Sequence, residues 1–171
     1  SHIGQRNIYA MIIGTTTALI LISGLLIVAL RSVKLGLISL LPNLAPAAVG
    51  FGLWGIFVGE IGLSLSLCAG MTFGIVIDDT VHFLSKYLRA RRENGLKPPD
   101  AVRYAFRTVG RALVMTTLVL VVGFSVLATS SFEMNAAMGL MTAIIITIAL
   151  ITVFLTLPPL LIKIEEVDTQ A

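Results

Sequence analysis

The sequence predicts an all-α membrane protein, a polytopic bundle of five transmembrane helices with one additional amphipathic helix. Of its 171 residues, 57% are hydrophobic and only 12% are charged, whereas soluble domains are about half apolar and a quarter charged. The apolar residues are gathered in runs of about twenty, which is the helix length needed to cross a bilayer. The uninterrupted run 143–157 shows no alternation with period two, so these runs are helices and not barrel strands.

Five runs are long enough to span the hydrocarbon core, and we assign them to a single transmembrane domain, residues 1–171. They are Asn7–Leu30, Leu35–Val58, Gly62–Leu84, Arg111–Ser130 and Ala136–Ile162. Short polar connections join most of them, so consecutive helices are expected to be antiparallel neighbours. The exception is the connection from Ser85 to Gly110, which is long.

The distribution of Lys and Arg predicts the orientation. Eleven of the 12 basic residues fall on one side of the predicted membrane, and only Arg6 falls on the other. Cytoplasmic loops are enriched in Lys and Arg, so the N-terminus is predicted outside and the C-terminus inside. Because the basic residues flank apolar runs, the net charge of +3 does not indicate a nucleic-acid partner. The acidic segment Glu165–Asp168 is interpreted as a solvated end.

Inside the long connection, residues 99–110 are predicted to form a cytoplasmic interfacial helix. Prolines followed by Asp100 are typical of a helix start. An apolar face containing Val102, Ala105, Phe106 and Val109 lies opposite a basic face. We expect the apolar face to enter the acyl boundary and the basic face to contact anionic headgroups, although a polar elbow between spans is the alternative. The basic residues are Arg103, Arg107 and Arg111.

The run 35–58 contains Pro42 and Pro46 near its inner end. Proline removes a backbone donor and kinks a helix. Kinked packing is the common outcome in membranes, and a hinge is the alternative.

The acid pair Asp78-Asp79 carries most of the functional information. Ionised carboxylates are expensive inside a bilayer and are usually functional there. In the run 62–84 the pair lies about 7–8 Å inward of the midpoint, still within the hydrocarbon. Burial and mutual repulsion both favour the protonated form of at least one acid, so the pair is suited to loading and releasing a proton. The alternative is a carboxylate that snorkels to the interface or pairs with Lys86.

Further residues are assigned to the surroundings of the pair. Gly70 and Gly74 precede Asp78 on nearly the same face and are expected to let another helix approach closely. His82 lies one turn inward and could extend a proton path, or it could be an ordinary interfacial histidine. Thr116 and Thr117 lie at a similar depth and could donate hydrogen bonds to the acids, or could bond their own backbone.

The segment Gly74–Phe83, with its Asp78-Asp79 pair, resembles the glycine–three residues–Asp-Asp motif of the resistance–nodulation–division (RND) superfamily. The resemblance continues through Leu41-Pro42-Asn43, Thr108–Ala112 and Thr116-Thr117, and so covers nearly the whole chain. It is strongest to the branch of MmpL-like, hopanoid-exporter and Dispatched-like proteins.

The resemblance implies a C-terminal membrane half in which Asp78 and Asp79 are the proton-coupling acids. The first half of the same transporter, with a porter domain before Ser1, would complete the protein. MmpL proteins typically have Asp-Tyr where this chain has Asp78-Asp79, and none of the five runs has the central lysine typical of tripartite drug pumps. Both differences leave open whether protons or sodium ions drive the cycle.

The function expected from this resemblance is proton-driven export of lipids or other hydrophobic molecules from a bacterial inner membrane. The alternative is a sterol-sensing-like regulatory membrane domain without transport. No enzymatic activity, metal or cofactor is expected. The expected partners are membrane lipid, a hydrophobic substrate and the first half of the transporter, with homo-oligomerisation and periplasmic accessory proteins as further expectations.

Overall fold

The computed structural model describes Tyr9, residues 13–14, 16–17, 20–28 and 31–57, and residues 63–170, with the backbone alone for 63–67, 69 and 166–170. All regular elements in this part of the chain are helical. The chain divides into two compact units, 1–40 and 41–171, which are described separately. Much of the predicted first span, 7–30, and the connection around Gly59 lie outside the described residues.

In the first unit, the helical residues 20–28 are followed by a turn and by α2, Val33–Ile38. Arg31 takes a positive φ of 48°, and Ser32 caps α2 by accepting a hydrogen bond from the Leu35 N–H at 3.3 Å. A Cβ on Gly36 would lie 2.6 Å from Cγ1 of Ile27, so the two helical segments are in direct contact. A tight turn therefore joins them, as the short connection predicted.

The predicted span 35–58 corresponds to the apolar helical stretch Val33–Ile56, which Ser39 divides into α2 and α3, Leu40–Phe57. The cause is Pro42, which cannot donate to the carbonyl of Ile38 and whose ring excludes that carbonyl. In α3, Pro42 lies in the first turn, where a missing N–H costs little. Pro46 lies inside α3 without ending it. The interruption of the helix thus falls at Ser39, before the first of the two prolines.

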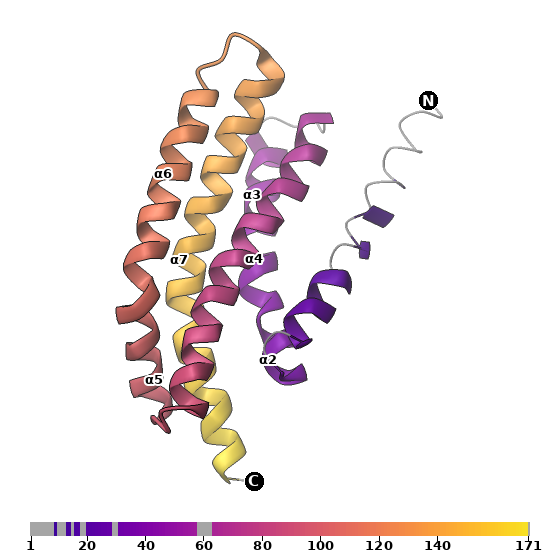
Figure 1. Ribbon diagram of the computed structural model, residues 1–171. Coiled ribbons are helices and arrows are strands. Elements are labelled where there is room, and N and C mark those ends of the chain that lie inside the picture. Colours follow the sequence, from indigo (N-terminus) through magenta and orange to yellow (C-terminus); the bar gives the residue numbers. More distant parts are fainter. Residues whose placement is uncertain are drawn as a thin grey trace. The chain divides into compact units, whose positions relative to one another are not determined.

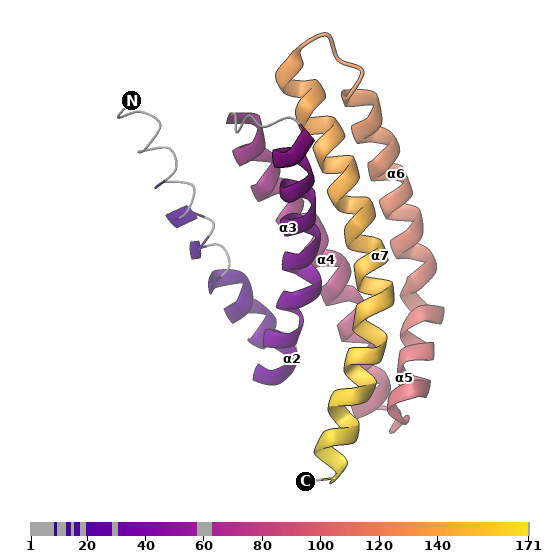
Figure 2. The same ribbon diagram turned by 180° about the vertical axis from the view of Figure 1, so that it is seen from behind.

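In the second unit α7, Glu133–Gln170, packs against both α6, Arg111–Leu127, and α4, Leu63–Arg92. Figures 1 and 2 show the three helices side by side, with α7 between its two partners. In Figure 2, which views the bundle from behind, α3 lies in front of α4 and beside α7. Phe51 and Trp54 of α3 pack there against a buried cluster of Cys68, Met141 and Ile145.

Residues 98–127 form a helix without a break in helical backbone, although its three parts differ in winding. They are α5, Pro98–Ala105, the π-helix η1, Phe106–Gly110, and α6. The predicted start is confirmed, with prolines in the first turn and Asp100 after them. Gly95, with φ of 60°, supplies the turn between α4 and α5. The connection between α4 and α5 is therefore much shorter than the predicted 85–110 segment, because α4 continues to Arg92.

The two predicted faces of 99–110 are confirmed, but the location of the apolar face is not. Ala101, Val102 and Ala105 are buried, and α5 packs against α4 and α7. The expectation that this face enters the acyl boundary is therefore wrong, since protein covers it.

By length and composition, three helices in the described ranges can cross a membrane: Val33–Ile56, Pro98–Leu127 and Glu133–Glu165. Large apolar side chains of α6 such as Leu118, Val119 and Val126 are more than half exposed, which suits a lipid-facing surface. The count of five spans and their orientation stay predictions.

Candidate functional site

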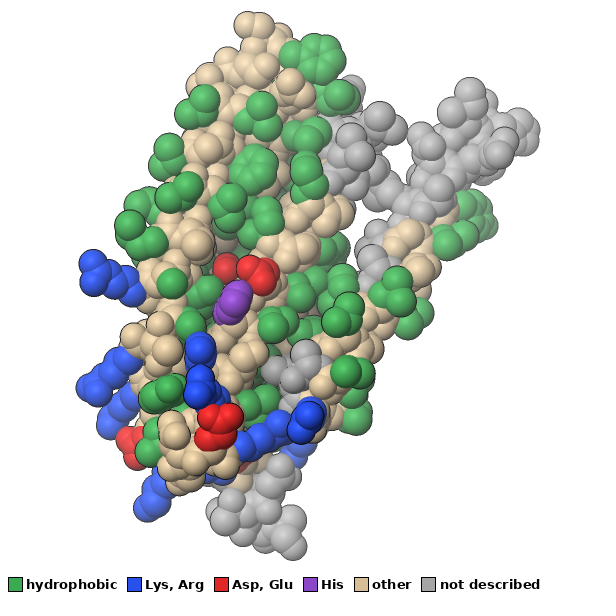
Figure 3. All heavy atoms as spheres, in the orientation of Figure 1, with side chains coloured by type: hydrophobic (Ala, Val, Ile, Leu, Met, Phe, Trp, Pro, Cys, Tyr) green, Lys and Arg blue, Asp and Glu red, His purple; other side chains and the backbone are tan. Residues whose placement is uncertain are grey.

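The acid pair lies on α4, well away from the charged end of the bundle. Figure 3 shows two acidic side chains and a histidine surrounded by hydrophobic side chains, while basic side chains gather near α5 and the end of α4. We call this second region the basic end; it contains Arg89 and Arg92 in the last turn of α4, Lys97 before α5 and Arg103 on α5. Asp79 is 16 residues after the start of α4 at Leu63, about 24 Å along the helix axis. The pair therefore lies in the half of α4 that is nearer the basic end.

The two acids face different surroundings, as their 100° separation on a helix predicts. Asp79 is buried and only 7% exposed. The Asp78 side chain is 71% exposed, and its Oδ1 lies 3.5 Å from Nε2 of His82, one turn along α4. One acid is thus enclosed by this chain, while the other lies on an open face beside an imidazole.

Gly70 and Gly74 lie on the same open face as Asp78. A Cβ on either glycine would meet no atom within 4 Å among those compared. No described helix of this chain therefore uses them for close approach, and their packing role stays a prediction.

The two threonines of α6 separate into an exposed and a buried one. Thr116 is exposed, and its hydroxyl donates to the carbonyl oxygens of Ala112 and Leu113 at 3.1 and 3.0 Å. Thr117 is buried, and its Oγ1 has no hydrogen-bond partner within the described part of the chain. Neither hydroxyl bonds Asp78 or Asp79 in this structure, so the predicted contact is absent here for both. Of these two threonines, only Thr117 has a buried hydroxyl without a hydrogen-bond partner among the described residues.

A buried hydrogen bond beside Asp79 was not predicted. Thr80 is fully buried, and its hydroxyl donates to Oδ1 of Asn43 on α3 at 2.6 Å. The Leu41-Pro42-Asn43 segment already stood out in the sequence, but the partner of Asn43, 37 residues away, was not visible there.

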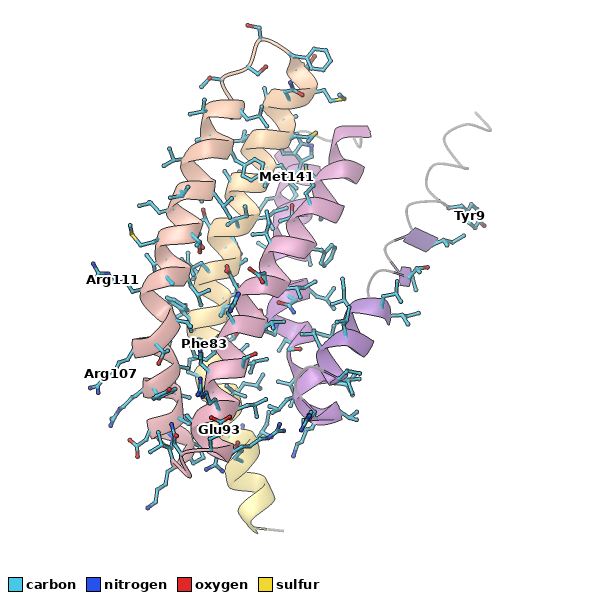
Figure 4. The ribbon with its side chains drawn as sticks, viewed as in Figure 1. Tyr9, Phe83, Glu93, Arg107, Arg111 and Met141 are labelled. Carbon is cyan, nitrogen blue, oxygen red and sulfur yellow. The ribbon has the colours of Figure 1, made fainter. Side chains whose placement is uncertain are left out.

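Between the acid pair and the basic end, three aromatic rings from three elements form a continuous apolar contact. Phe83 of α4 contacts Phe106 of η1 edge to face, with ring centroids 5.1 Å apart, and Phe106 contacts Phe154 of α7 at 5.0 Å. Figure 4 shows Phe83 inside the bundle, whereas Arg107 and Arg111 point away from it. Phe83 follows Asp79 by one turn on the same buried face of α4, so apolar rings separate Asp79 from the basic end.

Beyond the rings, a polar cluster joins the end of α4 to α7. The Tyr87 hydroxyl donates to Oε1 of Glu165 at 2.8 Å, and the Arg91 guanidinium forms an ion pair with the same carboxylate. Arg91 also donates to the carbonyl oxygen of Leu96 in the turn before α5. We call Tyr87, Arg91 and Glu165 the latch. The interpretation of Glu165 as part of a solvated end is therefore wrong.

The charge states within the latch follow from its burial and contacts. Burial, and then the hydrogen bond with Glu165, raises the pKa of Tyr87 above its usual range. The phenol therefore stays protonated and acts as the donor. The hydrogen bond with Glu165 also raises the pKa of Arg91, so this guanidinium stays charged.

We expect Glu165→Ala to lower the free energy of unfolding by about 2 kcal/mol, because it leaves the partly buried Arg91 charge without its counter-ion and the Tyr87 hydroxyl without its acceptor. The matched control is Glu93→Ala. Glu93 pairs with Arg89 at 2.7 Å, but both side chains are more than half exposed, so its loss should leave the melting point nearly unchanged.

Thermal unfolding of the purified protein in detergent measures the difference. Because the folded-state pKa of Tyr87 is raised, its contribution is constant below its unfolded value near pH 10 and is lost only above it. The Tyr87 contribution should therefore not vary between about pH 6 and pH 9. Equal melting points for the two variants would show that the latch contributes no more than a surface pair.

The chain is similar to known membrane proteins over most of its length. Residues 3–165 match the MMPL family. A protein of Methanocaldococcus jannaschii, named as a membrane protein, is 32% identical over 152 residues, which cover 89% of this chain and 39% of that relative. The chain thus spans about two fifths of the relative's length. No solved structure matches. On the match across almost its entire length, the chain belongs to the MMPL family of membrane proteins.

Proposed function

We propose that this chain is the ion-coupling membrane part of an exporter of lipids or other hydrophobic molecules, driven by protons through Asp78 and Asp79. The observation that carries the proposal is the division of the acid pair. Asp79 is enclosed in an apolar bundle, and Asp78 lies on an open face beside His82. Membership of the MMPL family supports a transporter of the RND kind.

The proposed role of the pair is to take up and release protons as its surroundings change. Carboxylates in a low-dielectric environment favour the protonated form, and access to water favours the ionised form. The aromatic contact of Phe83, Phe106 and Phe154 separates Asp79 from the basic end in this structure. Release of a proton from Asp79 toward the basic end therefore requires the three rings to move apart. The Asp78–His82 contact of 3.5 Å offers a second proton-accepting group one turn closer to the basic end.

The open face of α4 is proposed to be covered by the first half of the same transporter. A charged side chain facing lipid is expensive, and Asp78 is 71% exposed in this chain. Gly70 and Gly74 on the same face leave room for a helix to approach. A covering helix would convert this face into an enclosed site.

The exposed arginines of the 98–127 helix are proposed to contact anionic lipid headgroups. Arg103, Arg107 and Arg111 are all exposed, and Figure 4 shows Arg107 and Arg111 directed outward. Long basic side chains can reach the headgroups from positions inside the hydrocarbon boundary.

The proposed function is tested with the full-length protein in proteoliposomes that enclose a pH-sensitive dye. A fluorescent lipid serves as the hydrophobic probe. An imposed proton gradient should drive movement of the lipid, and lipid movement should be accompanied by proton flux in the opposite direction. Lipid movement driven equally by a sodium gradient without proton flux would replace protons by sodium as the coupling ion. Absence of gradient-driven movement under either ion would favour the regulatory alternative.

A further inference from the structure

Two contacts join the same three parts of the second unit. The aromatic contact of Phe83, Phe106 and Phe154 joins α4, η1 and α7. The latch joins α4 to α7 through the carboxylate of Glu165, and its arginine reaches the turn before α5 by donating to the carbonyl oxygen of Leu96. Figures 1 and 2 show this end of α4 and α5 beside α7. The parts that aromatic rings join inside the bundle are therefore joined again at the basic end by a hydrogen bond and an ion pair.

The aromatic contact and the latch follow Asp79 on successive turns of α4. Phe83, Tyr87 and Arg91 come after it at intervals of four residues, so each lies about 6 Å farther along the helix axis. Asp79, Phe83 and Tyr87 are buried, so this side of α4 is enclosed by the chain as far as the latch. Water that approaches Asp79 along this side from the basic end must pass the latch first and the aromatic contact second.

The space between the aromatic contact and the latch is filled with apolar side chains. Leu157 and Leu161 of α7 and Ala101 and Ala105 of α5 are all buried, and α4, α5 and α7 pack against one another in this region. Closely packed interiors transmit displacements because they contain few voids that could absorb them. A separation of α4 and α7 at the latch is therefore passed on to the aromatic rings.

The latch is better placed to hold these helices together than the exposed ion pair near it. The side chains of Arg91 and Glu165 are 31% and 23% exposed, whereas those of Arg89 and Glu93 are 56% and 63% exposed. Water screens the attraction between exposed charges and leaves such pairs with little effect on stability. Hydrogen bonds to a charged group that is partly withdrawn from water are among the stronger ones in proteins.

We propose that the latch is a conformational lock, which holds the aromatic contact closed and so controls when Asp79 can exchange protons with the basic end. The inference rests on the proposed function, since Asp79 is the acid proposed to carry protons. To open the lock, Tyr87 and Arg91 must give up the carboxylate of Glu165 that they share. α7 can then separate from the end of α4, and the rings follow because the side chains between them are closely packed.

The test measures how fast a thiol placed at the acid site reacts with a reagent from water. The full-length protein carries Asp79→Cys as the reporter, and Cys68→Ser removes the one cysteine of this chain. Any cysteine elsewhere in the protein is also replaced by serine. Open membrane fragments are treated with a charged, membrane-impermeant methanethiosulfonate, and the modified fraction is followed over time by mass spectrometry.

Two substitutions weaken the latch to different extents. Glu165→Gln keeps the size of the side chain and an acceptor for Tyr87 but removes the charge that pairs with Arg91, so the reporter should react about tenfold faster. Tyr87→Phe keeps the ring and removes one hydrogen bond, so the expected increase is about threefold. Glu93→Gln is the matched control, because it removes a charge from the exposed pair and should keep the parent rate.

Phe106→Ala shows whether the latch acts through the aromatic contact. It removes the ring that contacts both Phe83 and Phe154, so the reporter should react about tenfold faster or more in this variant alone. Adding Glu165→Gln should then bring little further increase, because two changes that act on one closure are not additive.

The inference would be overturned by a parent reaction rate in both latch variants. It would also be overturned if Glu165→Gln accelerated the reaction equally with and without Phe106, since the latch would then not act through the rings. Melting curves show whether each variant is folded. If Glu165→Gln does not fold, Tyr87→Phe decides alone, with and without Phe106→Ala.

Failure of the inference is distinguishable from failure of the proposed function, because reaction of the thiol requires no transport. If the latch variants leave the reporter unchanged while export in the parent protein requires Asp79, only the lock is removed. If the latch controls the reporter in a protein without gradient-driven export, the lock is supported and the proposed function is removed.

Discussion

Asp78→Asn and Asp79→Asn are each expected to reduce proton-driven export to the rate of protein-free liposomes, while the protein still reaches the membrane in normal amounts. Asparagine keeps the size of aspartate and resembles the hydrogen bonding of its protonated form, but it cannot exchange a proton. Loss of a group that transfers protons commonly costs about 10²-fold or more. The measurement is export of a fluorescent lipid under an imposed pH gradient.

Thermal unfolding separates loss of coupling from loss of structure in these variants. Because enclosed carboxylates are expensive, both substitutions should leave the melting point unchanged or raise it. The increase should be larger for Asp79, which is buried, than for Asp78, which is exposed. Asp100→Asn is the control. Asp100 contacts Arg103 at 3.5 Å on the exposed side of α5, so its loss should change neither export nor stability. Full export by the Asp78→Asn, Asp79→Asn double variant would remove the coupling role.

Gly139→Ala is expected to lower the free energy of unfolding by about 1–3 kcal/mol or more, through overpacking. A Cβ on Gly139 would lie 2.6 Å from the carbonyl oxygen of Phe124 and 2.7 Å from the amide nitrogen of Ala128. Both are backbone atoms of the facing segment at the end of α6. They cannot rotate away, so the two helices must separate where they pack most closely.

The neighbouring helix supplies the matched control, Gly123→Ala. A Cβ on Gly123 would meet nothing within 4 Å, and alanine is the better helix former by up to about 1 kcal/mol. Gly123→Ala should therefore keep or raise the melting point. If the Gly139→Ala and Gly123→Ala proteins have the same melting temperature, α6 and α7 do not make the contact described at Gly139.

The sequence was sufficient for features that depend on neighbouring residues along one helix. The helical class follows from the apolar runs, the opposite faces of 99–110 follow from spacing, and the divergence of Asp78 and Asp79 follows from helical geometry. Small size alone does not separate Gly139 from Gly123, because both lie in apolar runs and only Gly139 has close neighbours in the structure.

Features that depend on which helix lies opposite could not be predicted. Tyr87 and Glu165 are 78 residues apart, and a carboxylate near the end of an apolar run gives no local sign of its partner. The apolar face of α5 illustrates the same limit, because its pattern is identical whether lipid or α4 covers it. The break at Ser39 could have been placed more closely, since Pro42 disfavours helix at the carbonyl four residues earlier.

The π-helix at Phe106–Gly110 changes how the helix 98–127 is read on a helical wheel. Its buried positions are Ala101, Val102, Ala105, Gly110, Leu113 and Thr117. The interval from Ala105 to Gly110 is five residues, whereas Ala101–Ala105, Gly110–Leu113 and Leu113–Thr117 are three or four residues apart. The five-residue interval coincides with the π-turn, which takes up about one additional residue. The inward stripes before and after it are therefore out of phase by one position, about 100° of rotation. A single regular wheel drawn through all 30 residues would assign the wrong face to one of its two ends.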